Sequence, residues 1–402
     1  MTEFQAASRV NRIKPSPSSL ASARARDLKA EGRDIVDLTV GEPDFDTPAN
    51  IKAAGIAAIE TGDTKYTAVN GTPALRAAIA AKFERTLGLT YGNDQICVGG
   101  GAKQIIFLAL MASVEDGAEV IIPAPYWVSY PDMVLANDGT PVIVQCPEKD
   151  GFKLTPQALE AAITPKTRWL ILNYPSNPTG SIYTRDELAG LAEVLLRHPH
   201  VRVLTDEIYN EVLFGAEADA SLASIDARLK DRVFIVNGVS KTYAMTGWRI
   251  GYGVGDAGLV AAINKLQSQM SSCPSSISQA ATVEALNGDQ SFVKEAAAVY
   301  RARRDRAVEL INAIPGLSCP PPEGAFYLFP SCAGILGKTA PDGRTIETDL
   351  DFILYLLDSA GVAALHGSAY GMPGYFRMSI ATSEAVIEEA CRRIDAAVRA
   401  LR

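Results

Sequence analysis

The sequence has few histidines, no closely spaced cysteines and no long apolar run. Two of its three histidines, His198 and His200, lie in a proline-containing loop with no third ligand nearby in the chain, so we expect no metal site. The six cysteines are dispersed without a Cys-x-x-Cys pair, which is typical of reduced thiols in the cytoplasm. No apolar stretch approaches the roughly 20 residues of a membrane span, and the N-terminus lacks the features of a secretory leader. We therefore expect a cytoplasmic protein that crosses no membrane.

Basic residues are also outnumbered by acidic ones. The chain carries 38 Lys and Arg residues against 46 Asp and Glu residues, which gives a formal net charge of −8. This balance argues against non-specific binding to nucleic acid or to an anionic membrane. It leaves an anionic substrate open, because a local cluster of Arg and Lys can override the average charge.

The middle of the chain alternates apolar runs that suit strands with helical patterns. Such an alternation predicts βαβ units and a mainly parallel sheet, whose binding sites gather at the carboxyl ends of the strands. The expected strands cover residues 95–98, 119–122, 141–144, 169–172, 201–205, 233–237 and 250–254. The helices expected between them cover residues 74–87, 103–111, 185–196 and 258–270.

The two ends of the chain follow a different pattern. With 402 residues, the chain suits a large domain plus a smaller one. We expect an extended arm, a helix over 21–30 and a short strand over 35–40 near the N-terminus, and helices over 291–314 and 385–402 near the C-terminus. The predicted division is an arm and part of a small domain (1–48), a large domain (49–288) and a small α+β domain (289–402).

Two of the predicted strands are followed by residues that could be catalytic, a lysine and an aspartate. Lys241 comes after the strand at 233–237, in a loop of small and apolar residues that also holds Arg249. A loop lysine is usually a solvated charge, but a second cation in a partly apolar site lowers the pKa of the amine and favours imine chemistry. Asp206 directly follows the run at 201–204, where a carboxylate either caps a helix or pairs with a buried cation.

Two further segments have weaker signals when taken alone. Residues 173–180 (Asn-Tyr-Pro-Ser-Asn-Pro-Thr-Gly) would form a turn-rich loop in any case. Residues 99–104 (Gly-Gly-Gly-Ala-Lys-Gln) lie between a strand and a helix, where backbone N–H groups can hold a phosphate. A run of glycines is by itself weak evidence for such a site.

Together the four segments resemble the class I aminotransferase family, the aspartate aminotransferase-like enzymes of pyridoxal 5′-phosphate (PLP) fold type I, and in particular their bacterial branch. The resemblance covers nearly the whole chain. Its most specific parts are Asn-x-Pro-x-Asn-Pro-Thr-Gly and Ser-Lys-x-x-x-Met-Thr-Gly-Trp-Arg, with residues 41–44 and 376–379 in family order. It implies an α/β fold whose large domain holds a mostly parallel seven-stranded sheet, beside a smaller α+β domain.

The resemblance implies roles around the PLP ring. Lys241 would hold the cofactor as a Schiff base and then move a proton as general base and acid. Asp206 would pair with the protonated pyridine nitrogen, which makes the ring an electron sink. Tyr209 and Asn177 would donate hydrogen bonds to the ring O3′. The two ring faces would be covered by Trp127 and Ile208.

The resemblance also implies a phosphate site and a dimer. Arg249 and the backbone of Gly101 and Ala102 would bind the phosphate, with Lys103 beside them. Position 238 is Gly where some relatives have Ser, so one hydroxyl contact to the phosphate is expected to be missing. Tyr66 resembles a tyrosine that reaches the phosphate of the neighbouring subunit, which implies a homodimer with shared active sites.

For the substrate, the family implies an α-carboxylate held by Arg377, whose guanidinium forms two-pronged contacts. Gly41 and Asn177 would add donors, and Trp127 would also contact the substrate. A second carboxylate needs a second cation, for which Lys103 and Lys14 are the candidates. The alternative for both lysines is a solvated surface position.

Leu108 follows Phe107 where close relatives often carry Asn, a change that we expect to alter the polarity of the pocket wall and to broaden acceptance toward aromatic substrates. The expected reaction is a ping-pong transfer of the amino group from L-aspartate to 2-oxoglutarate, giving oxaloacetate and glutamate. Aminotransfer from aromatic amino acids or to prephenate, and a PLP-dependent lyase on the same scaffold, are the alternatives. A PLP-sensing DNA-binding regulator is disfavoured by the net charge of −8.

Overall fold

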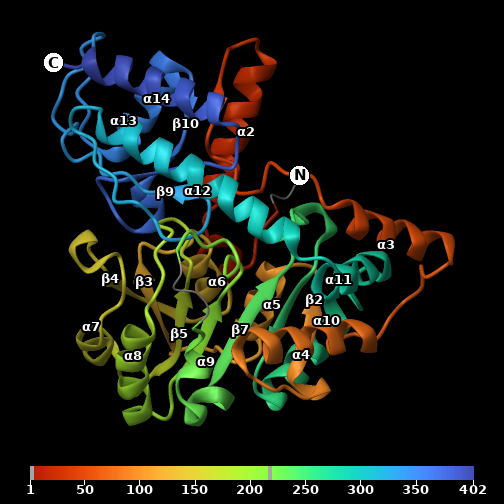
Figure 1. The fold of residues 1–402 in the computed structure, drawn as a ribbon. Coiled ribbons are helices and arrows are strands. Elements are labelled where there is room, and N and C mark those ends of the chain that lie inside the picture. The colour runs from red at the N-terminus through yellow and green to blue at the C-terminus, as the bar shows by residue number, and fades with distance from the viewer. Residues whose placement is uncertain (1–3, 216–219) are drawn as a thin grey trace.

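A twisted sheet forms the centre of the computed structural model, which describes residues 4–215 and 220–402 (Figure 1). Within those residues the sheet has seven strands in the order β2-β8-β7-β6-β5-β3-β4. Strand β8 is antiparallel to both of its neighbours, and the pairs from β7 to β4 are parallel, so the predicted mostly parallel seven-stranded sheet is confirmed. The strands are β2 (Ile96–Gly99), β3 (Glu119–Ala124), β4 (Thr140–Gln145), β5 (Thr167–Asn173), β6 (Arg202–Asp206), β7 (Val233–Gly238) and β8 (Gly251–Val254).

Side chains of the central strands alternate between two buried cores, one on each face of the sheet. Along β5, Leu170 and Leu172 enter one core, while Trp169 and Ile171 enter the other. This period of two is the geometry of a strand buried on both faces. The first core is completed by α3 (Ala49–Glu60), α4 (Pro73–Leu87), α8 (Arg185–Arg197), α9 (Leu222–Ile225) and α11 (Ser276–Asn287). The second is completed by α5 (Ala102–Met111), α6 (Tyr130–Ala136) and α10 (Ala257–Met270).

The expectation for Leu108 is wrong. The Leu108 side chain is fully buried in the second core, between the sheet and α5. On the same helix Lys103 and Ile106 face the cavity described below. A step of five residues turns a helix by about 140° past one full turn, which directs position 108 to the sheet. An apolar residue at this position therefore serves packing rather than the polarity of a pocket wall.

The C-terminal part forms a third core above the carboxyl ends of the central strands (Figure 1). It contains a three-stranded antiparallel sheet, in the order β11-β12-β9, and the parallel pair β1-β10. Val36 and Leu38 from the N-terminal segment belong to this core. Its elements are β1 (Val36–Asp37), α12 (Ser291–Asn312), β9 (Tyr327–Leu328), α13 (Asp349–Tyr355), β10 (Val362–Ala363), β11 (Leu365–His366), β12 (Phe376–Ser379) and α14 (Glu384–Arg399).

The strand expected over 35–40 is only two residues long in the structure. Leu38 still donates to the Ala363 carbonyl and accepts from the Ser379 N–H, so its backbone bonds to β10 and β12. At Thr39 and Gly41 the backbone carbonyls bond to side chains instead. The carbonyl oxygen of Thr39 accepts from Arg377, and that of Gly41 accepts from Lys241. The sequence pattern therefore located an apolar segment correctly but missed its change of role. The other helices are α1 (Ser8–Asn11), α2 (Pro17–Ala30) and α7 (Pro156–Ala162).

A buried ion pair ties α4 to the segment after β6. Lys82 is 1% exposed, and its Nζ lies 3.0 Å from Oε1 of Glu211. Removing one member of a buried pair leaves the other charge uncompensated. We expect Lys82→Met to lower the free energy of unfolding by about 3 kcal/mol, and Lys82→Met combined with Glu211→Met to recover most of that loss. Urea unfolding followed by circular dichroism measures both.

The exposed pair Lys52–Asp46 supplies the control, because its side chains are 47% and 97% exposed. Lys52→Met should change the free energy of unfolding by less than about 1 kcal/mol. A double variant of the buried pair that is no more stable than Lys82→Met alone would contradict the explanation by an uncompensated charge.

Candidate active site

A cavity of about 520 Å³ lies where β5, β6 and β7 end, between the main sheet and the N-terminal helix α2. Its walls come from segments far apart in the chain: the loop after β1, the start of α5, the ends of the central strands and β12. The structure brings most of the predicted site residues into this one cavity. Those that line it are Gly41, Ala102, Lys103, Trp127, Asn177, Asp206, Ile208, Tyr209, Lys241, Arg249 and Arg377.

Lys241 stands in the loop directly after β7. Its Nζ donates a hydrogen bond to the carbonyl oxygen of Gly41 at 2.5 Å. Burial lowers the pKa of Lys241 to about 8, with Glu42 raising the pKa and the cations Arg377 and Arg249 lowering it. A pKa of about 8 leaves a substantial neutral fraction of the amine near neutral pH, as a nucleophile that forms imines requires.

Asp206 is the last residue of β6 and is buried at the cavity wall. Its Oδ2 accepts a hydrogen bond from the Tyr130 hydroxyl at 2.7 Å, and its Oδ1 accepts a longer one from the Ile208 N–H at 3.4 Å. Burial raises the pKa of Asp206 to about 6, against these hydrogen bonds and the charge of Lys241. A cationic partner in the cavity would stabilise the ionised carboxylate.

Sequence reasoning missed Tyr130. Its hydroxyl reaches Asp206 across 76 positions of the chain, and its ring meets the edge of the Trp127 ring at a centroid distance of 5.2 Å. The only available signal was its place three residues after Trp127, in a segment that was expected to cover one ring face.

Arg377 is buried on β12 without an acidic partner among the ion pairs of the described residues. Its Nη1 donates to Oδ1 of Asn177 at 3.1 Å, and its Nη2 donates to the carbonyl oxygen of Thr39 at 2.6 Å. Its Nε has no hydrogen-bond partner among the described residues. A buried guanidinium is costly unless it is paired with an anion. The arrangement therefore suits a bound carboxylate.

The turn before α5 forms a cradle in which two glycines allow close approach of the backbone. A Cβ atom at Gly251 would lie 2.1 Å from the Ala102 nitrogen, and Gly101 has a φ of +107°. Ala102 is the first residue of α5, where backbone N–H groups have no acceptor within the helix and can bind an anion. The Gly101 N–H donates to the Gly99 carbonyl at 2.8 Å, so it is already engaged.

Cations stand beside this cradle. Arg249 donates to the carbonyl oxygens of Thr246 at 2.8 Å and Gly100 at 3.0 Å. Lys103 Nζ lies 4.6 Å from the centre of the Trp127 ring, and burial, followed by the charge of Arg249, lowers the pKa of Lys103. The start of α5 therefore combines free N–H groups with two positive charges, as a phosphate site requires.

Close packing explains why position 238 is a glycine in this structure. A Cβ at this position would meet Cδ1 of Ile208 and the carbonyl oxygen of Ile250, each at 3.0 Å. A serine would therefore need Ile208, which lines the cavity, to move.

Three predicted residues do not line the cavity: Gly101, which precedes Ala102 in the cradle, and Tyr66 and Lys14. Tyr66 is 89% exposed on the segment after α3. Lys14 precedes α2, and its backbone N–H donates to Oδ1 of Asp132 at 3.1 Å. Neither residue lines the cavity of this single chain.

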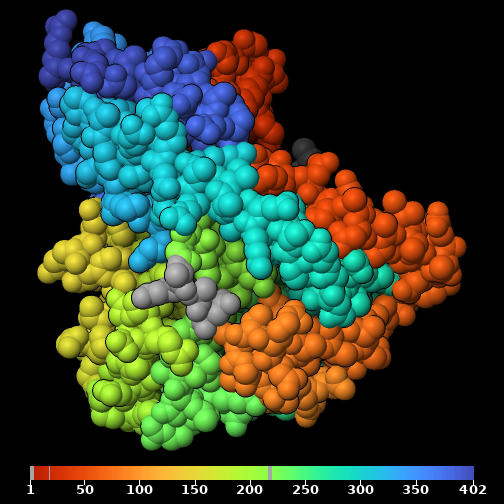
Figure 2. All heavy atoms as spheres, viewed as in Figure 1, coloured from red at the N-terminus to blue at the C-terminus, as the bar shows by residue number. Residues whose placement is uncertain are grey.

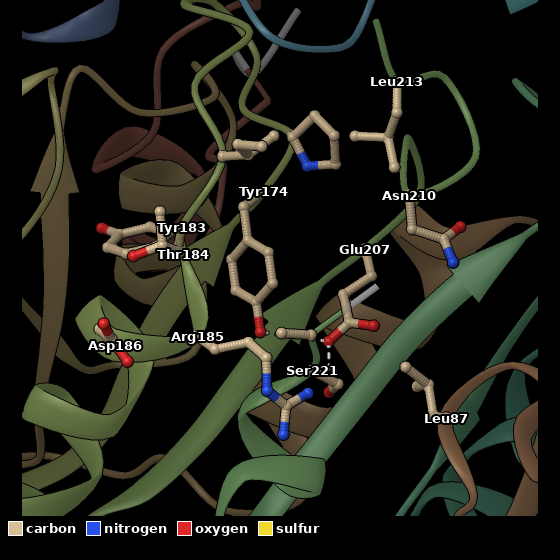
Figure 3. A pocket seen from close by; sticks show the side chains of 13 residues that line it. Leu87, Tyr174, Tyr183, Thr184, Arg185, Asp186, Glu207, Asn210, Leu213 and Ser221 are labelled. Carbon is tan, nitrogen blue, oxygen red and sulfur yellow. Dashed lines mark hydrogen bonds between the residues drawn. The ribbon is translucent and has the colours of Figure 1, made fainter. Parts of the chain in front are cut away.

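A second cavity, of about 310 Å³, lies beside Glu207 (Figure 3). Glu207 follows Asp206 in the chain but turns away from it, and its Oε1 accepts from the hydroxyls of Ser221 at 2.7 Å and Tyr174 at 3.3 Å. The Tyr174 hydroxyl in turn accepts from the Leu222 N–H at 3.1 Å. These bonds fasten the chain around residue 221 to the ends of β5 and β6. None of the predicted site residues lines this cavity.

Within residues 4–215 and 220–402, no three His, Cys, Asp or Glu side chains are grouped to hold a metal ion. No helix in the described ranges has both the length and the apolar character to span a bilayer. The first cavity instead fits PLP, which is an aldehyde with a basic ring nitrogen and a phosphate. Lys241 suits the aldehyde, Asp206 the ring nitrogen, and the cradle at Ala102 the phosphate.

The chain belongs to the family of class I and II aminotransferases, whose sequence pattern matches residues 33–394. It is 54% identical over 385 residues to a probable aspartate/prephenate aminotransferase of Rhizobium leguminosarum bv. phaseoli, covering 96% of each chain. It is 53% identical over 394 residues to the aspartate aminotransferase of Rhizobium meliloti strain 1021, covering 98% of this chain and 96% of the relative.

Solved structures agree with this assignment. The crystal structure of the aspartate aminotransferase from Rhizobium meliloti matches with a TM-score of 0.97 at 52% identity, over 100% of both chains. The aspartate aminotransferase from Thermus thermophilus with maleate matches with a TM-score of 0.92 at 37% identity, over 98% of this chain and 100% of the other. The predicted family and the PLP fold type I are both confirmed.

The raised pKa of Asp206 leads to a test of stability against pH. Because burial raises this pKa from 3.8 to about 6, the ionised carboxylate destabilises the folded, cofactor-free protein above pH 6. The cost falls as the pH drops toward 4. We expect Asp206→Asn to stabilise the cofactor-free protein at pH 8 by about 1–3 kcal/mol, and by less at pH 5. Thermal unfolding at the two pH values measures the gain; equal gains would contradict the assigned cause.

Proposed function

We propose that this aminotransferase uses PLP to move the amino group of L-aspartate to 2-oxoglutarate in a ping-pong reaction, giving oxaloacetate and glutamate. The observation that carries the proposal is the meeting of three groups in one cavity: the amine of Lys241, the buried carboxylate of Asp206 and the unpaired guanidinium of Arg377. They suit an aldehyde, a ring nitrogen and an α-carboxylate respectively. Chemically, bound PLP supplies an electron sink for the negative charge that forms at the substrate Cα.

The protein's own groups bind, orient and move protons. Lys241, once its amine is free and neutral, would take the proton from the substrate Cα and deliver it to the cofactor carbon on the other side of the bridging nitrogen. The Asp206 carboxylate would accept a hydrogen bond from the ring nitrogen and hold the proton there. Tyr209 donates to the ring O3′. Arg377 and Asn177 hold the α-carboxylate, which presents the Cα–H bond to Lys241.

Other residues of the cavity position the cofactor. The phosphate is held by the backbone N–H groups of Ala102 and Lys103 and by Arg249. Trp127 and Ile208, which both line the cavity, would cover the two faces of the ring. The Gly101 N–H is bonded to Gly99, so we assign the phosphate contact chiefly to Ala102.

Aspartate is proposed from the cavity charge and from the relatives together. The matched relatives are named aspartate or aspartate/prephenate aminotransferases, and the Thermus thermophilus structure holds maleate, a dicarboxylate. Lys103 and Arg26 are cations on the cavity wall to which no other role is assigned, and we assign the second carboxylate to Lys103. Gly41 adds a backbone N–H donor for the α-carboxylate of the substrate. Prephenate as amino acceptor is the second candidate, favoured by the name of the relative in Rhizobium leguminosarum bv. phaseoli.

The decisive experiment has two parts. A panel of amino donors is tested with 2-oxoglutarate as the acceptor, and aspartate is tested as the donor with prephenate as the acceptor. Activity with aspartate as the best donor supports the main proposal. A clear preference for prephenate over 2-oxoglutarate as acceptor supports the second. Elimination products without amino transfer would contradict both.

The role of Lys103 can be tested by charge removal. Lys103→Ala should raise KM for aspartate about 10- to 100-fold more than KM for a neutral amino acid, because only the dicarboxylate loses an ionic contact. Steady-state kinetics with both donors measures the ratio. The change in KM for aspartate relative to that for the neutral donor, measured in Lys14→Ala, tests whether Lys14 contacts the substrate. Equal losses for the two donors would refute a side-chain role for Lys103.

We further propose a cytoplasmic homodimer with shared active sites, built from an arm (1–48), a large domain (49–288) and a small domain (289–402). Supporting the dimer, α3 and the segment after it project from the body of the chain (Figure 2) and carry exposed apolar side chains. Ile56 and Ile59 are each 55% exposed, and Tyr66 is 89% exposed. Large exposed apolar groups that cluster in this way suit an interface. All six cysteines are free thiols, in keeping with a reducing compartment.

A mixing experiment tests the sharing of sites. In a dimer whose Tyr66 serves the partner's cofactor, Lys241→Ala and Tyr66→Ala subunits form one intact site when they combine. Unfolding and refolding an equal mixture should therefore restore about a quarter of the wild-type activity at limiting PLP, from two almost inactive parents. Activity that remains at the average of the two parents would contradict a shared site.

A further inference from the structure

Tyr327 lies between the cofactor side and the substrate side of the cavity. It belongs to β9 and is 1% exposed. Its hydroxyl lies 2.9 Å from the hydroxyl of Tyr209, and its ring centre lies 4.4 Å from the guanidinium carbon of Arg377. One side chain thus touches both the proposed donor to the ring O3′ and the proposed ligand of the α-carboxylate.

Either hydroxyl can be the donor in this contact, and the two directions have different consequences for the cavity. A tyrosine hydroxyl has one proton to donate and an oxygen that can accept. If Tyr209 donated its proton to Tyr327, it would have none left for a group in the cavity. The opposite arrangement, in which Tyr327 donates to Tyr209, leaves the Tyr209 proton free to point into the cavity.

The surroundings of Tyr327 favour a fixed, neutral hydroxyl. Burial raises the pKa of Tyr327, with the charge of Arg377 lowering it, and burial also raises the pKa of Tyr209 well above its ordinary value. Both phenols therefore keep their protons at neutral pH. On the other side, a Cβ at Gly41 would lie only 3.1 Å from the Tyr327 hydroxyl oxygen, so the backbone of the Gly41 loop covers it closely.

We propose that Tyr327 is a positioning residue whose hydroxyl donates to Tyr209 and so directs the Tyr209 proton to the ring O3′ of bound PLP, while its ring braces Arg377. The proposal rests on the proposed function, because it needs PLP bound at Lys241. The hydroxyl and the ring have separate tasks, and two substitutions separate them.

Tyr327→Phe removes the hydroxyl and keeps the ring. A weaker donor at Tyr209 leaves more negative charge on O3′, which stabilises the protonated nitrogen of the lysine–cofactor linkage. We expect the pKa read from the visible absorbance of the holoenzyme to rise by about 0.5–1 unit. KM for aspartate should change less than about 2-fold, because the Arg377 contact remains. Tyr327→Leu removes the ring as well and should raise KM for every amino donor about 10-fold.

Tyr355→Phe is the matched control. Tyr355 is a buried tyrosine of the C-terminal core whose hydroxyl donates to the Ala397 carbonyl at 2.8 Å, and it does not line the cavity. This variant should lose a similar amount of stability and leave the absorbance titration unchanged. A role for Tyr327 in stability alone would make the two variants behave alike, and that result would overturn the proposal.

A double-mutant cycle with Tyr209→Phe completes the test. If Tyr327 acts through Tyr209, adding Tyr327→Phe to Tyr209→Phe should produce no further shift in the absorbance titration. Full additivity of the two shifts would overturn the proposed path. Failure of the wild-type protein to develop any visible band with PLP would instead contradict the proposed function, so the two failures are distinguishable.

Discussion

The register of three parallel strands fixes the positions on which the rest of the site depends. Asn173 at the end of β5 pairs with Asp206 at the end of β6, and Asp206 pairs with Val236 of β7. Because parallel strands end at one edge, the segments that follow them start side by side. The loop with Asn177, the carboxylate of Asp206 and the loop with Lys241 therefore share one cavity. The Gly41 and Arg377 segments cover it from the C-terminal core.

Two buried charges in the site destabilise the folded protein, and the rest of the fold must offset this loss of stability. Arg377 is buried without an acidic partner among the described ion pairs, and Asp206 is a buried carboxylate whose pKa is raised to about 6. Each favours binding of the opposite charge over stability of the empty protein. The extensive cores on both faces of the sheet supply the stability that allows this.

The sequence predicts features that depend on neighbouring residues, and it does not predict contacts between residues far apart in the chain. The strands and the residues directly after them, such as Asp206, were found because period and position are local properties. The segment around Lys241 is ambiguous by itself, and the proposed role of this lysine rests on the resemblance to a family. Tyr327 and Tyr130 were missed because their partners lie 118 and 76 positions away, and nothing local indicates such contacts. The expectation for Leu108 failed because helical periodicity, and not closeness to Lys103 in the chain, decides which face of α5 a residue occupies.

The most direct test of the central claim is a single half-reaction. Purified protein loaded with PLP is mixed with L-aspartate without an oxo acid, and its absorbance is followed. The account predicts that the band of the lysine-bound cofactor is replaced by that of pyridoxamine phosphate, with one oxaloacetate formed per site, and that Lys241→Ala shows neither band change nor product. A cofactor-loaded protein whose spectrum remains unchanged with aspartate and with every other amino acid would contradict the assignment of the cavity as an aminotransferase site.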